Sequence, residues 1–163
     1  KQTAVHQVSE ALSHFVVKDV LESLIASLHP ETRKVSVVPV LKGDSSVSMS
    51  SLPGALTQVF SNLILNSVYH AFEQQPEPQI LIEFFEQSED VVFIYQDNGC
   101  GVEKELHKKI FEPFTRVHKR DDYPGSGIGL AIAQQVVRVH QGEIECDSAF
   151  DRGTRFVIRL PRC

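Results

Sequence analysis

The sequence lacks the features of a membrane-spanning protein and those of a protein stabilised by disulfide bonds. Its 163 residues contain no Trp and one Met, and no stretch approaches the roughly 18 consecutive apolar residues of a membrane span. The three cysteines, at positions 100, 146 and 163, form no CxxC pair, and their odd number disfavours a disulfide framework. The N-terminus shows no signal-peptide pattern. We therefore expect a cytoplasmic domain. Because residue 1 is Lys rather than Met, we interpret the chain as a fragment of a parent protein that has room for an anchor in the inner or plasma membrane.

The chain also lacks an excess of positive charge. It has 16 Lys and Arg residues against 21 Asp and Glu residues, a formal net charge of -5 at pH 7. A protein without a basic field gains little electrostatic attraction to phosphate backbones, so we expect no nucleic-acid partner. With 42% hydrophobic residues and no repeat, the chain has the size and composition of a domain that builds its own core.

The first part of the chain has the pattern of a helix followed by a β-hairpin. Apolar residues recur every three or four positions over residues 3–28, which predicts one helix or two helices that meet near residues 14–18. Pro30 ends this pattern, because the residue before a proline avoids the helical region. The β-branched residues at 35, 37, 38 and 40 predict a strand over residues 34–41 that turns at 43–46 into a short strand over 47–49.

The rest of the chain alternates helices with pairs of strands. Pro53 begins the strongest predicted helix, whose apolar face comprises Leu56, Val59, Phe60, Leu63, Ile64, Ser67 and Ala71. Strands are predicted over residues 80–85, 91–95, 143–148 and 154–160, and a helix over 131–140 that ends in a left-handed cap at Gly142. Adjacent strand pairs separated by helices favour an α+β fold, with a mixed, mostly antiparallel sheet and the helices on one face.

Two glycine clusters bracket one segment in the middle of the chain. Asp97-Asn98-Gly99-Cys100-Gly101 directly follows a predicted strand, and residues 125–130 (Gly-Ser-Gly-Ile-Gly-Leu) directly precede a predicted helix. Glycine lets a ligand approach the main chain without a Cβ in the way. A helix N-terminus adds unpaired N–H groups and a positive dipole end, which favour a phosphate chain. The pattern therefore predicts a nucleotide held largely by main chain.

Two asparagines on the strongest helix indicate a second part of the site. Asn62 and Asn66 are four residues apart, so both amides project from one side of the helix, and His70 and Glu73 continue the same line. An amide oxygen that faces a polyphosphate suits Mg²⁺, which keeps several waters and takes few protein ligands. Capping or packing of the two amides is an equally good interpretation of the spacing alone.

These residues together carry a family resemblance. Residues 62–66 resemble the N box of the histidine-kinase catalytic domain, 97–101 its first glycine box, 111–114 (Phe-Glu-Pro-Phe) its F box, and 125–130 its second glycine box. All four stand in the family's order, and the resemblance covers roughly residues 16–161. The wider class is the GHKL ATPases, so the resemblance implies the Bergerat (GHKL) fold, a two-layer α/β sandwich with three helices against a mixed sheet.

The resemblance also implies a role for each matched residue. Asp97 would accept a hydrogen bond from the adenine amine of ATP, Asn66 would hold Mg²⁺ on the phosphates, and Asn62 would support Asn66 or orient water. Thr154 would reach the adenine through water, and Phe111 and Phe114 would close a lid or act as a plain hydrophobic anchor. The other implied nucleotide-binding residues are Gly99, Gly101, Val102, Gly125, Ser126, Gly127, Ile128, Gly129 and Leu130.

One position departs from the family pattern. Many relatives carry a lysine three residues beyond the second Asn, where this chain has Tyr69. The phosphate contact usually given to that lysine must then come from elsewhere or be absent. The candidates are His70, Arg116, Lys119 and Arg120, and for the three in the lid a solvated charged loop is an alternative interpretation.

The fragment has no residue that matches the phosphoaccepting histidine of such kinases. That histidine is typically followed by an acidic residue, whereas His6 precedes Gln7 and His14 precedes Phe15. We therefore interpret residues 1–14 as the tail of a helix from a dimerisation domain and residues 15–163 as the catalytic domain.

The expected function is that of an ATP-dependent protein histidine kinase. The chain would transfer the γ-phosphoryl group to a histidine on the dimerisation domain of its own, homodimeric parent protein, with a response regulator downstream. Two alternatives remain at this point, a GHKL ATPase and a non-catalytic nucleotide-sensing module. The GHKL ATPases carry a glutamate base where this chain has Asn62, which disfavours water activation.

Overall fold

The computed structural model describes residues 12–113, 129–147 and 152–163. The helices are α1 (Val17–Ser27), α2 (His29–Thr32), α3 (Pro53–His70) and α4 (Gly129–Val139), with short 3-10 turns at η1 (Arg33–Val35), η2 (Lys104–Leu106) and η3 (Lys109–Phe111). The strands are β1 (Ser13–Val16), β2 (Val40–Lys42), β3 (Ser48–Ser51), β4 (Ile80–Gln87), β5 (Asp90–Asp97), β6 (Glu143–Cys146) and β7 (Thr154–Pro161).

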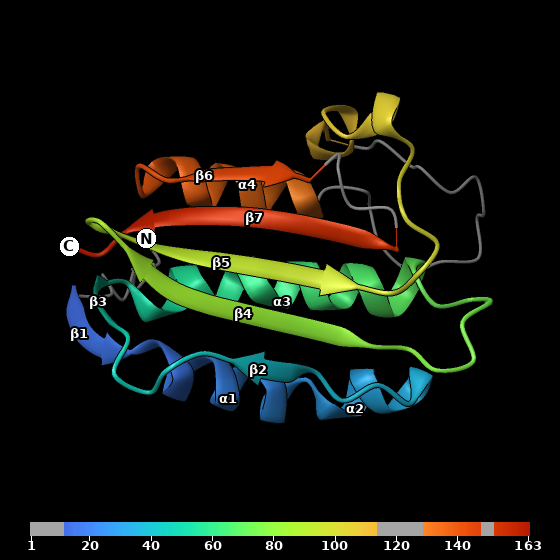
Figure 1. The fold of residues 1–163 in the computed structure, drawn as a ribbon, viewed down its shortest axis with the longest axis horizontal. Helices are drawn as coiled ribbons and strands as arrows, with labels where there is room; N and C mark the ends of the chain where they lie inside the picture. Colours follow the sequence, from blue (N-terminus) through green and yellow to red (C-terminus); the bar gives the residue numbers. More distant parts are fainter. Residues whose placement is uncertain (1–11, 114–128, 148–151) are drawn as a thin grey trace, which may run out of the picture.

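Five of these strands form the main sheet, in the order β2-β4-β5-β7-β6. The pairing of β2 with β4 is parallel and the other three pairings are antiparallel. Strands β1 and β3 form a separate antiparallel pair at one end of the molecule (Figure 1). The mixed, mostly antiparallel sheet predicted from the sequence is confirmed.

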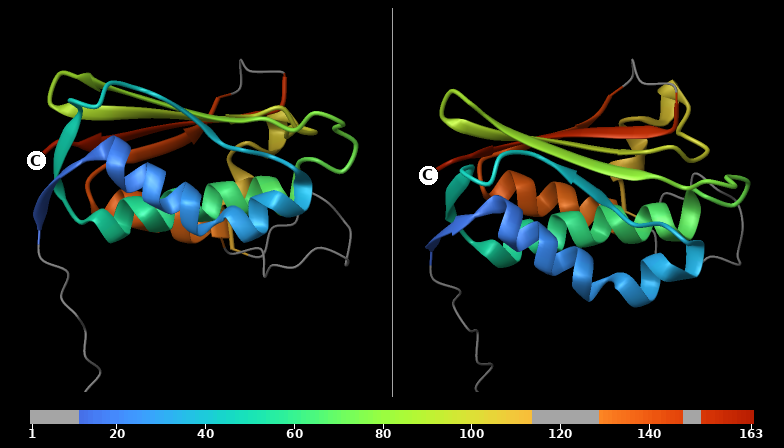
Figure 2. Two further views of the ribbon diagram at one scale, coloured as in Figure 1. Left: turned by 90° about the horizontal axis from the view of Figure 1, so that it is seen from below. Right: turned by 60° about the horizontal axis from the view of Figure 1, so that its bottom comes forward.

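The helices cover one face of the main sheet, and none of the helices in the described residues lies on the other face (Figure 2). The core lies between the two layers and contains fully buried aromatic side chains from both, Phe60 on α3 and Phe93 on β5, whose ring centroids are 5.2 Å apart. The two-layer sandwich with three long helices on one face is therefore as expected.

Helix α3 runs through the middle of the helical layer. All seven residues of its predicted apolar face are buried, and the polar residue among them, Ser67, is only 1% exposed. Pro53 stands in the first turn, where its missing N–H costs no helical hydrogen bond. The burial of this face fixes the rotation of α3 and so decides where Asn62 and Asn66 lie.

The predicted helix over residues 3–28 is wrong where it covers residues 13–16. These residues form β1, which pairs with β3 in the register Ser13 to Ser51, and α1 begins only at Val17. Helical spacing of apolar residues does not by itself exclude a strand when a second short strand offers backbone partners. Residues 1–11 lie outside the described residues, so the predicted division between residues 14 and 15 stays a prediction. Pro30 stands in the first turn of α2, after α1 has ended.

The predicted first hairpin is also wrong. Strand β2 pairs in parallel with β4 and β3 pairs with β1, so the two do not pair with each other. Residues 33–35 are a 3-10 turn and Ser36 has a left-handed backbone with φ 56°, so the strand predicted from 34 begins at Val40. The strand pairs β4 with β5 and β6 with β7 are antiparallel neighbours as expected.

The predicted cap of α4 is displaced by one residue. Gln141, not Gly142, has the positive φ of 61°. Glycine is required at 142 for a different reason, because a Cβ there would collide with the carbonyl oxygen of Arg159. The glycine therefore allows the turn after α4 to lie against β7.

No helix in the described parts of the chain combines the length and the hydropathy that a membrane span requires.

Candidate functional site

Asp97 lies at the end of the central strand β5, between the sheet and α3. It is 5% exposed, and its carboxylate accepts three hydrogen bonds. Oδ1 accepts from the backbone N–H of Gly99 at 3.0 Å and from that of Thr154 at 3.2 Å, and Oδ2 accepts from the hydroxyl of Ser67 at 2.7 Å. The register of the sheet sets Asp97 directly opposite Thr154, so two strands and one helix fix the carboxylate.

The electrostatic state of Asp97 results from two opposed effects. Burial raises the pKa of the carboxyl, and the hydrogen bonds from Ser67, Gly99 and Thr154 lower it, with burial the larger effect. A carboxylate has about four lone-pair positions, and the three donors occupy both positions on Oδ1 and one on Oδ2. One acceptor position therefore remains on Oδ2, enough for a single N–H donor such as an adenine amine.

The loop after Asp97 is held by the chain segment that precedes β4. The side-chain oxygen of Asn98 accepts from the N–H of Gln79 at 2.7 Å, and its amide nitrogen donates to the carbonyl of Glu77 at 2.9 Å. Gln75 donates through Nε2 to the carbonyl of Asn98 at 2.8 Å. These bonds fix the direction in which the main chain leaves β5.

The two glycines of this loop are required by contacts within the protein. A Cβ at Gly99 would collide with the carbonyl oxygen of Ala71 at the end of α3. Gly101 has a left-handed backbone with φ 74°, and a Cβ there would lie 3.0 Å from the carbonyl oxygen of Gly153. The first glycine cluster thus brings the loop against α3 and against the turn before β7, rather than leaving open space for a ligand at these positions.

Asn62 and Asn66 are half-buried on α3, one turn apart. The amide nitrogen of Asn62 is buried and has no hydrogen-bond partner in the described part of the chain. An unpaired buried donor is costly, which is consistent with a site that a water or a ligand oxygen completes. The described residues contain no group of three or more His, Cys, Asp or Glu side chains able to hold a metal. An amide oxygen such as that of Asn66 is a ligand type that Mg²⁺ takes together with phosphate oxygens and water.

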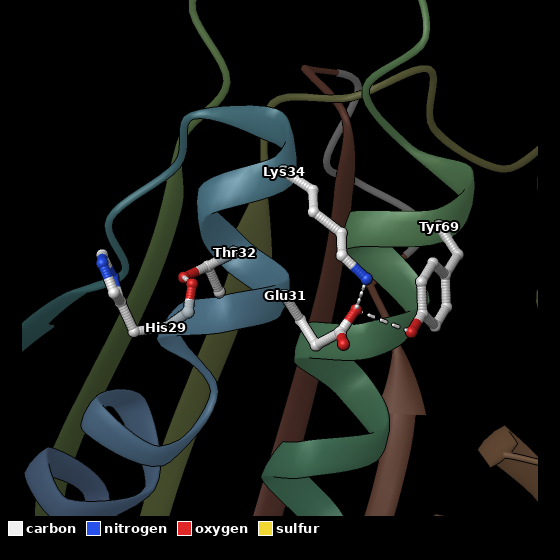
Figure 3. Close-up of polar contacts among 5 residues, drawn as sticks. All are labelled: His29, Glu31, Thr32, Lys34 and Tyr69. Atoms are coloured by element: carbon white, nitrogen blue, oxygen red, sulfur yellow. Dashed lines mark hydrogen bonds and ion pairs between the residues drawn. The ribbon is translucent and has the colours of Figure 1, made fainter.

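Tyr69, at the position where the family resemblance implies a lysine, points toward α2 (Figure 3). Its hydroxyl donates to Oε2 of Glu31 at 2.9 Å, and the ammonium of Lys34 donates to the same oxygen at 3.0 Å. The hydrogen bonds from Lys34 and then from Tyr69 lower the pKa of Glu31. In the free protein Tyr69 therefore connects α3 to α2 and offers no cation.

The N-terminus of α4 begins at Gly129, and nothing in the described chain lies within 4 Å of the position of a Cβ there. Packing among the described residues does not require glycine at this position, which is consistent with close approach by a ligand. Leu130 is half-buried and lies against the core. Val102 is also half-buried, and its carbonyl accepts from Nε2 of His107 at 2.8 Å. Phe111 is 7% exposed and its ring meets that of Phe156 at 5.9 Å, as a hydrophobic anchor would.

Several predicted site residues lie outside the described residues. They are Phe114, Arg116, Lys119, Arg120, Gly125, Ser126, Gly127 and Ile128. Of the candidates for the missing phosphate contact only His70 is described, and it is half-buried at the end of α3.

The sequence did not single out two polar residues near Asp97. Ser67 contacts Asp97 directly, and Tyr95 contacts it through Ser67. Ser67 was assigned to the apolar face of α3, and Tyr95 to a plain strand, yet both are fully buried and hydrogen-bonded to each other at 2.6 Å. The available signal was a hydroxyl in an otherwise apolar face, one residue after Asn66.

Comparison with known proteins places the chain in a family. The model of the family described as "Histidine kinase-, DNA gyrase B-, and HSP90-like ATPase" matches residues 52–163. The chain is 32% identical over 152 residues to the phytochrome-like protein Cph1 of Synechocystis sp., which covers 89% of this chain and 19% of that protein. It is also 32% identical over 149 residues to the sensor protein TdiS of Thauera aromatica, across 90% of this chain and 26% of that protein.

Solved structures have the same fold. The catalytic domain of histidine kinase ThkA, free of nucleotide, superposes with a TM-score of 0.78 at 20% identity, across 93% of this chain and 95% of that one. The structure of ThkA in complex with response regulator protein TrrA superposes with a TM-score of 0.75 at 19% identity, across 93% of this chain and 42% of that one. The matched family model and the relatives lead to one conclusion: this chain belongs to the histidine kinase-, DNA gyrase B- and HSP90-like ATPase family, as a catalytic domain of the kind found in sensor histidine kinases.

Proposed function

We propose that the chain binds Mg-ATP and transfers its γ-phosphoryl group to a histidine on a separate dimerisation domain. The observation that carries the proposal is the carboxylate of Asp97, buried at the end of β5 with one acceptor position left on Oδ2. That position accepts the N–H of an adenine amine and repels the carbonyl that guanine has at the same place. A hydrogen bond to a charged group contributes about 1.5–3 kcal/mol, enough to select the base.

The phosphates would extend from the adenine toward α3 and α4. Asn66 would supply an amide oxygen to Mg²⁺, and the buried N–H of Asn62 would donate to a bound water or a phosphate oxygen. Residues 127–130 would present backbone N–H groups at the N-terminus of α4, where the helix dipole favours negative charge. The magnesium ion would neutralise charge on the β- and γ-phosphates.

The transfer itself would need little covalent chemistry from this chain. A nitrogen of the acceptor imidazole would form a bond to the γ-phosphorus while the bond from that phosphorus to the β–γ bridging oxygen breaks, and ADP would leave with the electron pair. The residues of this chain would hold the phosphates in line and stabilise the charge that develops, which are the main contributions to phosphoryl transfer. The described histidines of the chain are not needed as acceptors in this scheme.

The partners of the reaction would lie outside the chain, which spans only 19% of Cph1 and 26% of TdiS. We infer a dimerisation domain in the same parent protein, which would bring two copies together, and a response regulator that receives the phosphoryl group. The complex of ThkA with response regulator protein TrrA supports the second inference by analogy of fold alone.

A second candidate function is nucleotide sensing without phosphoryl transfer. It is favoured by one observation, that Tyr69 stands where many relatives have a lysine and donates to Glu31 instead of offering a charge to the phosphates. A domain of this kind would bind the nucleotide and change its contacts with a partner.

Labelled ATP distinguishes these functions. The chain is incubated with γ-labelled ATP and Mg²⁺, with and without the dimerisation domain of its own parent protein, and the label is followed on protein and as free phosphate. A kinase labels a histidine of the added domain, slowly because the two parts are untethered, and does not label itself. Free phosphate alone indicates an ATPase. Binding of ATP without either product contradicts the kinase function and supports the sensing module.

A further inference from the structure

We propose that Ser67 is a positioning residue for nucleotide recognition, whose hydroxyl fixes the carboxylate of Asp97 in the orientation that accepts adenine. The inference rests on the proposed adenine contact of Asp97 and adds a residue that the sequence comparison with the family boxes did not single out. Ser67 would not contact the nucleotide itself. It would act through Asp97, from the buried face of α3.

The geometry for this role is a series of three hydrogen-bonded side chains, Tyr95, Ser67 and Asp97. The hydroxyl of Ser67 lies 2.7 Å from Oδ2 of Asp97 and 2.6 Å from the hydroxyl of Tyr95, and the Tyr95 hydroxyl also lies 3.1 Å from the carbonyl oxygen of Leu63. Ser67 and Tyr95 are 1% and 0% exposed. Short bonds between fully buried groups have no competing water, so the arrangement is held in one geometry.

The direction of the hydrogen bonds follows from the number of protons. A carboxylate only accepts, so the single proton of the Ser67 hydroxyl points to Asp97. The short contact between Ser67 and Tyr95 must then use the proton of Tyr95, with the carbonyl of Leu63 as its alternative acceptor. The direction of donation is therefore from Tyr95 to Ser67 and from Ser67 to Asp97, with the last bond on the very oxygen that has the free acceptor position.

The hydrogen bonds among Tyr95, Ser67 and Asp97 determine what Asp97 can accept. The two backbone donors hold Oδ1, and among the described residues Ser67 is the donor that holds Oδ2. Without the hydroxyl, Oδ2 would have two open acceptor positions, and the carboxylate would be oriented only by the bonds on Oδ1. The adenine amine would then meet a carboxylate that is less well oriented, at a site where the bond must form in one geometry.

Ser67 also helps to keep Asp97 ionised. Burial raises the pKa of Asp97, and the Ser67 hydroxyl is the strongest of the hydrogen-bond donors that lower it. Asp97 in turn raises the pKa of Tyr95, Cys100 and Cys146. Burial is the first cause of the raised pKa in each of the three, so all three are neutral near pH 7.

A purely structural role for Ser67 is the competing interpretation, in which the hydroxyl only satisfies Tyr95 in the core. The two roles differ in what the substitution Ser67→Ala does. Alanine is the best helix former and leaves Tyr95 with the carbonyl of Leu63 as an acceptor. The variant therefore removes the bonds of Ser67 to Asp97 and to Tyr95 but leaves Tyr95 with an acceptor.

The test measures the affinity of the full chain for Mg-ADP by calorimetry across a range of pH, for the parent chain, Ser67→Ala, Ser67→Cys and the control Ser61→Ala. Ser61 stands on the same helix, and its substitution leaves the Asp97 contacts in place. Ser67→Cys nearly keeps the side-chain volume and replaces the O–H by a weak S–H donor, which provides a second variant if alanine impairs folding. Circular dichroism verifies the fold of each protein.

We expect Ser67→Ala to weaken Mg-ADP binding roughly tenfold near neutral pH, because the less well oriented carboxylate forms a weaker bond to the adenine amine. The carboxylate form binds, so affinity is present above the pKa of Asp97 and is lost as the pH falls through it. Removal of a donor raises that pKa further, so the acid loss of affinity should begin at a higher pH in Ser67→Ala. Titration of the nucleotide is the same in all four proteins and cancels from the comparison.

Each outcome has one meaning. An affinity reduced equally at every pH, with the acid midpoint unchanged, shows a structural role and overturns the inference. Unchanged affinity in Ser67→Ala also overturns it. If the parent chain itself does not bind Mg-ADP, the proposed function fails first, and that failure is distinguishable because it appears before any substitution is made. Reduced affinity with a raised midpoint in both Ser67 variants, and parental behaviour in Ser61→Ala, supports the positioning role.

Discussion

The two ends of the candidate site are built differently. At the end proposed to bind adenine, here called the adenine end, the carboxylate of Asp97 is almost completely buried and receives two backbone N–H groups and one buried hydroxyl. At the end proposed to bind the phosphates, here called the phosphate end, Asn62 and Asn66 are half-buried side chains on one helix, and no atom of the described residues lies within 4 Å of a Cβ built at Gly129. The adenine end is thus formed by the protein itself, whereas the phosphate end has groups that a ligand must complete. Substitutions at the first end should affect every adenine nucleotide, and those at the second should depend on phosphates and Mg²⁺.

The largest effect is expected from Asp97→Asn. The amide keeps an acceptor oxygen for Gly99 and Thr154 but presents an N–H₂ donor where Oδ2 stood, so it opposes the adenine amine. We expect ADP and ATP affinity to fall by the same factor, on the order of a hundredfold. Calorimetry with both nucleotides measures it. An effect on ATP much larger than that on ADP would assign Asp97 to the phosphate end. It would contradict the division of the site into an adenine end at Asp97 and a phosphate end on α3 and α4.

Asn66→Ala should remove the magnesium dependence of binding and leave the adenine contact in place. Alanine favours the helix and the apolar face of α3 is untouched, so the fold should be retained. ATP affinity in the presence of Mg²⁺ should fall to about the value measured in its absence, a loss of roughly ten- to a hundredfold. Titrations with Mg²⁺ and with a chelator provide the measurement. A variant that responds to Mg²⁺ as strongly as the parent would show that Asn66 is structural.

Gly129→Ala should change stability and affinity in opposite directions. The backbone of Gly129 is not in the left-handed region and a Cβ meets nothing in the described chain, so alanine should stabilise α4 by about 0.4–1 kcal/mol. The same methyl group stands where a phosphate would approach the N–H groups, and ATP affinity should fall several-fold, as for one lost hydrogen bond. Denaturation and calorimetry on the same samples provide both values. If affinity stays unchanged while stability rises, the N-terminus of α4 does not hold phosphates.

Tyr69→Phe should have the smallest effect. Its hydroxyl donates to the half-exposed Glu31, so its loss should lower the melting temperature by no more than about 2–4 °C, the change expected for about 1 kcal/mol in a domain of this size. Nucleotide affinity should stay within twofold of the parent value, because the hydroxyl faces α2 (Figure 3). A tenfold loss of ATP affinity without loss of ADP affinity would instead place Tyr69 at the phosphate end.

Much of the fold was predictable because its strongest sequence signals are local. The apolar face of α3, the antiparallel pair β4 and β5, and α4 each follow from the spacing of apolar residues within one segment. The order of the family boxes then identified the family. In each of these cases the residues that define an element are neighbours in the sequence.

The errors concern partners that are distant in the sequence. Nothing in residues 13–16 indicates that they pair with residues 48–51 rather than extend a helix, and nothing in residues 40–42 indicates a parallel partner in β4. Ser67 was missed for the same reason, because its acceptor on Asp97 is 30 positions away. Hydrogen bonds across elements depend on tertiary packing, which periodicity within one element does not encode.

The most direct test of the central claim compares Mg-ADP with Mg-GDP on the parent chain and on Asp97→Asn. We predict that the parent chain binds Mg-ADP and discriminates against Mg-GDP by at least tenfold, because the buried carboxylate accepts from the adenine amine and repels the guanine carbonyl. In Asp97→Asn the preference should shrink or reverse, since the amide can donate to that carbonyl. Equal affinity of the parent chain for both nucleotides would contradict adenine recognition by Asp97 and with it the proposed site.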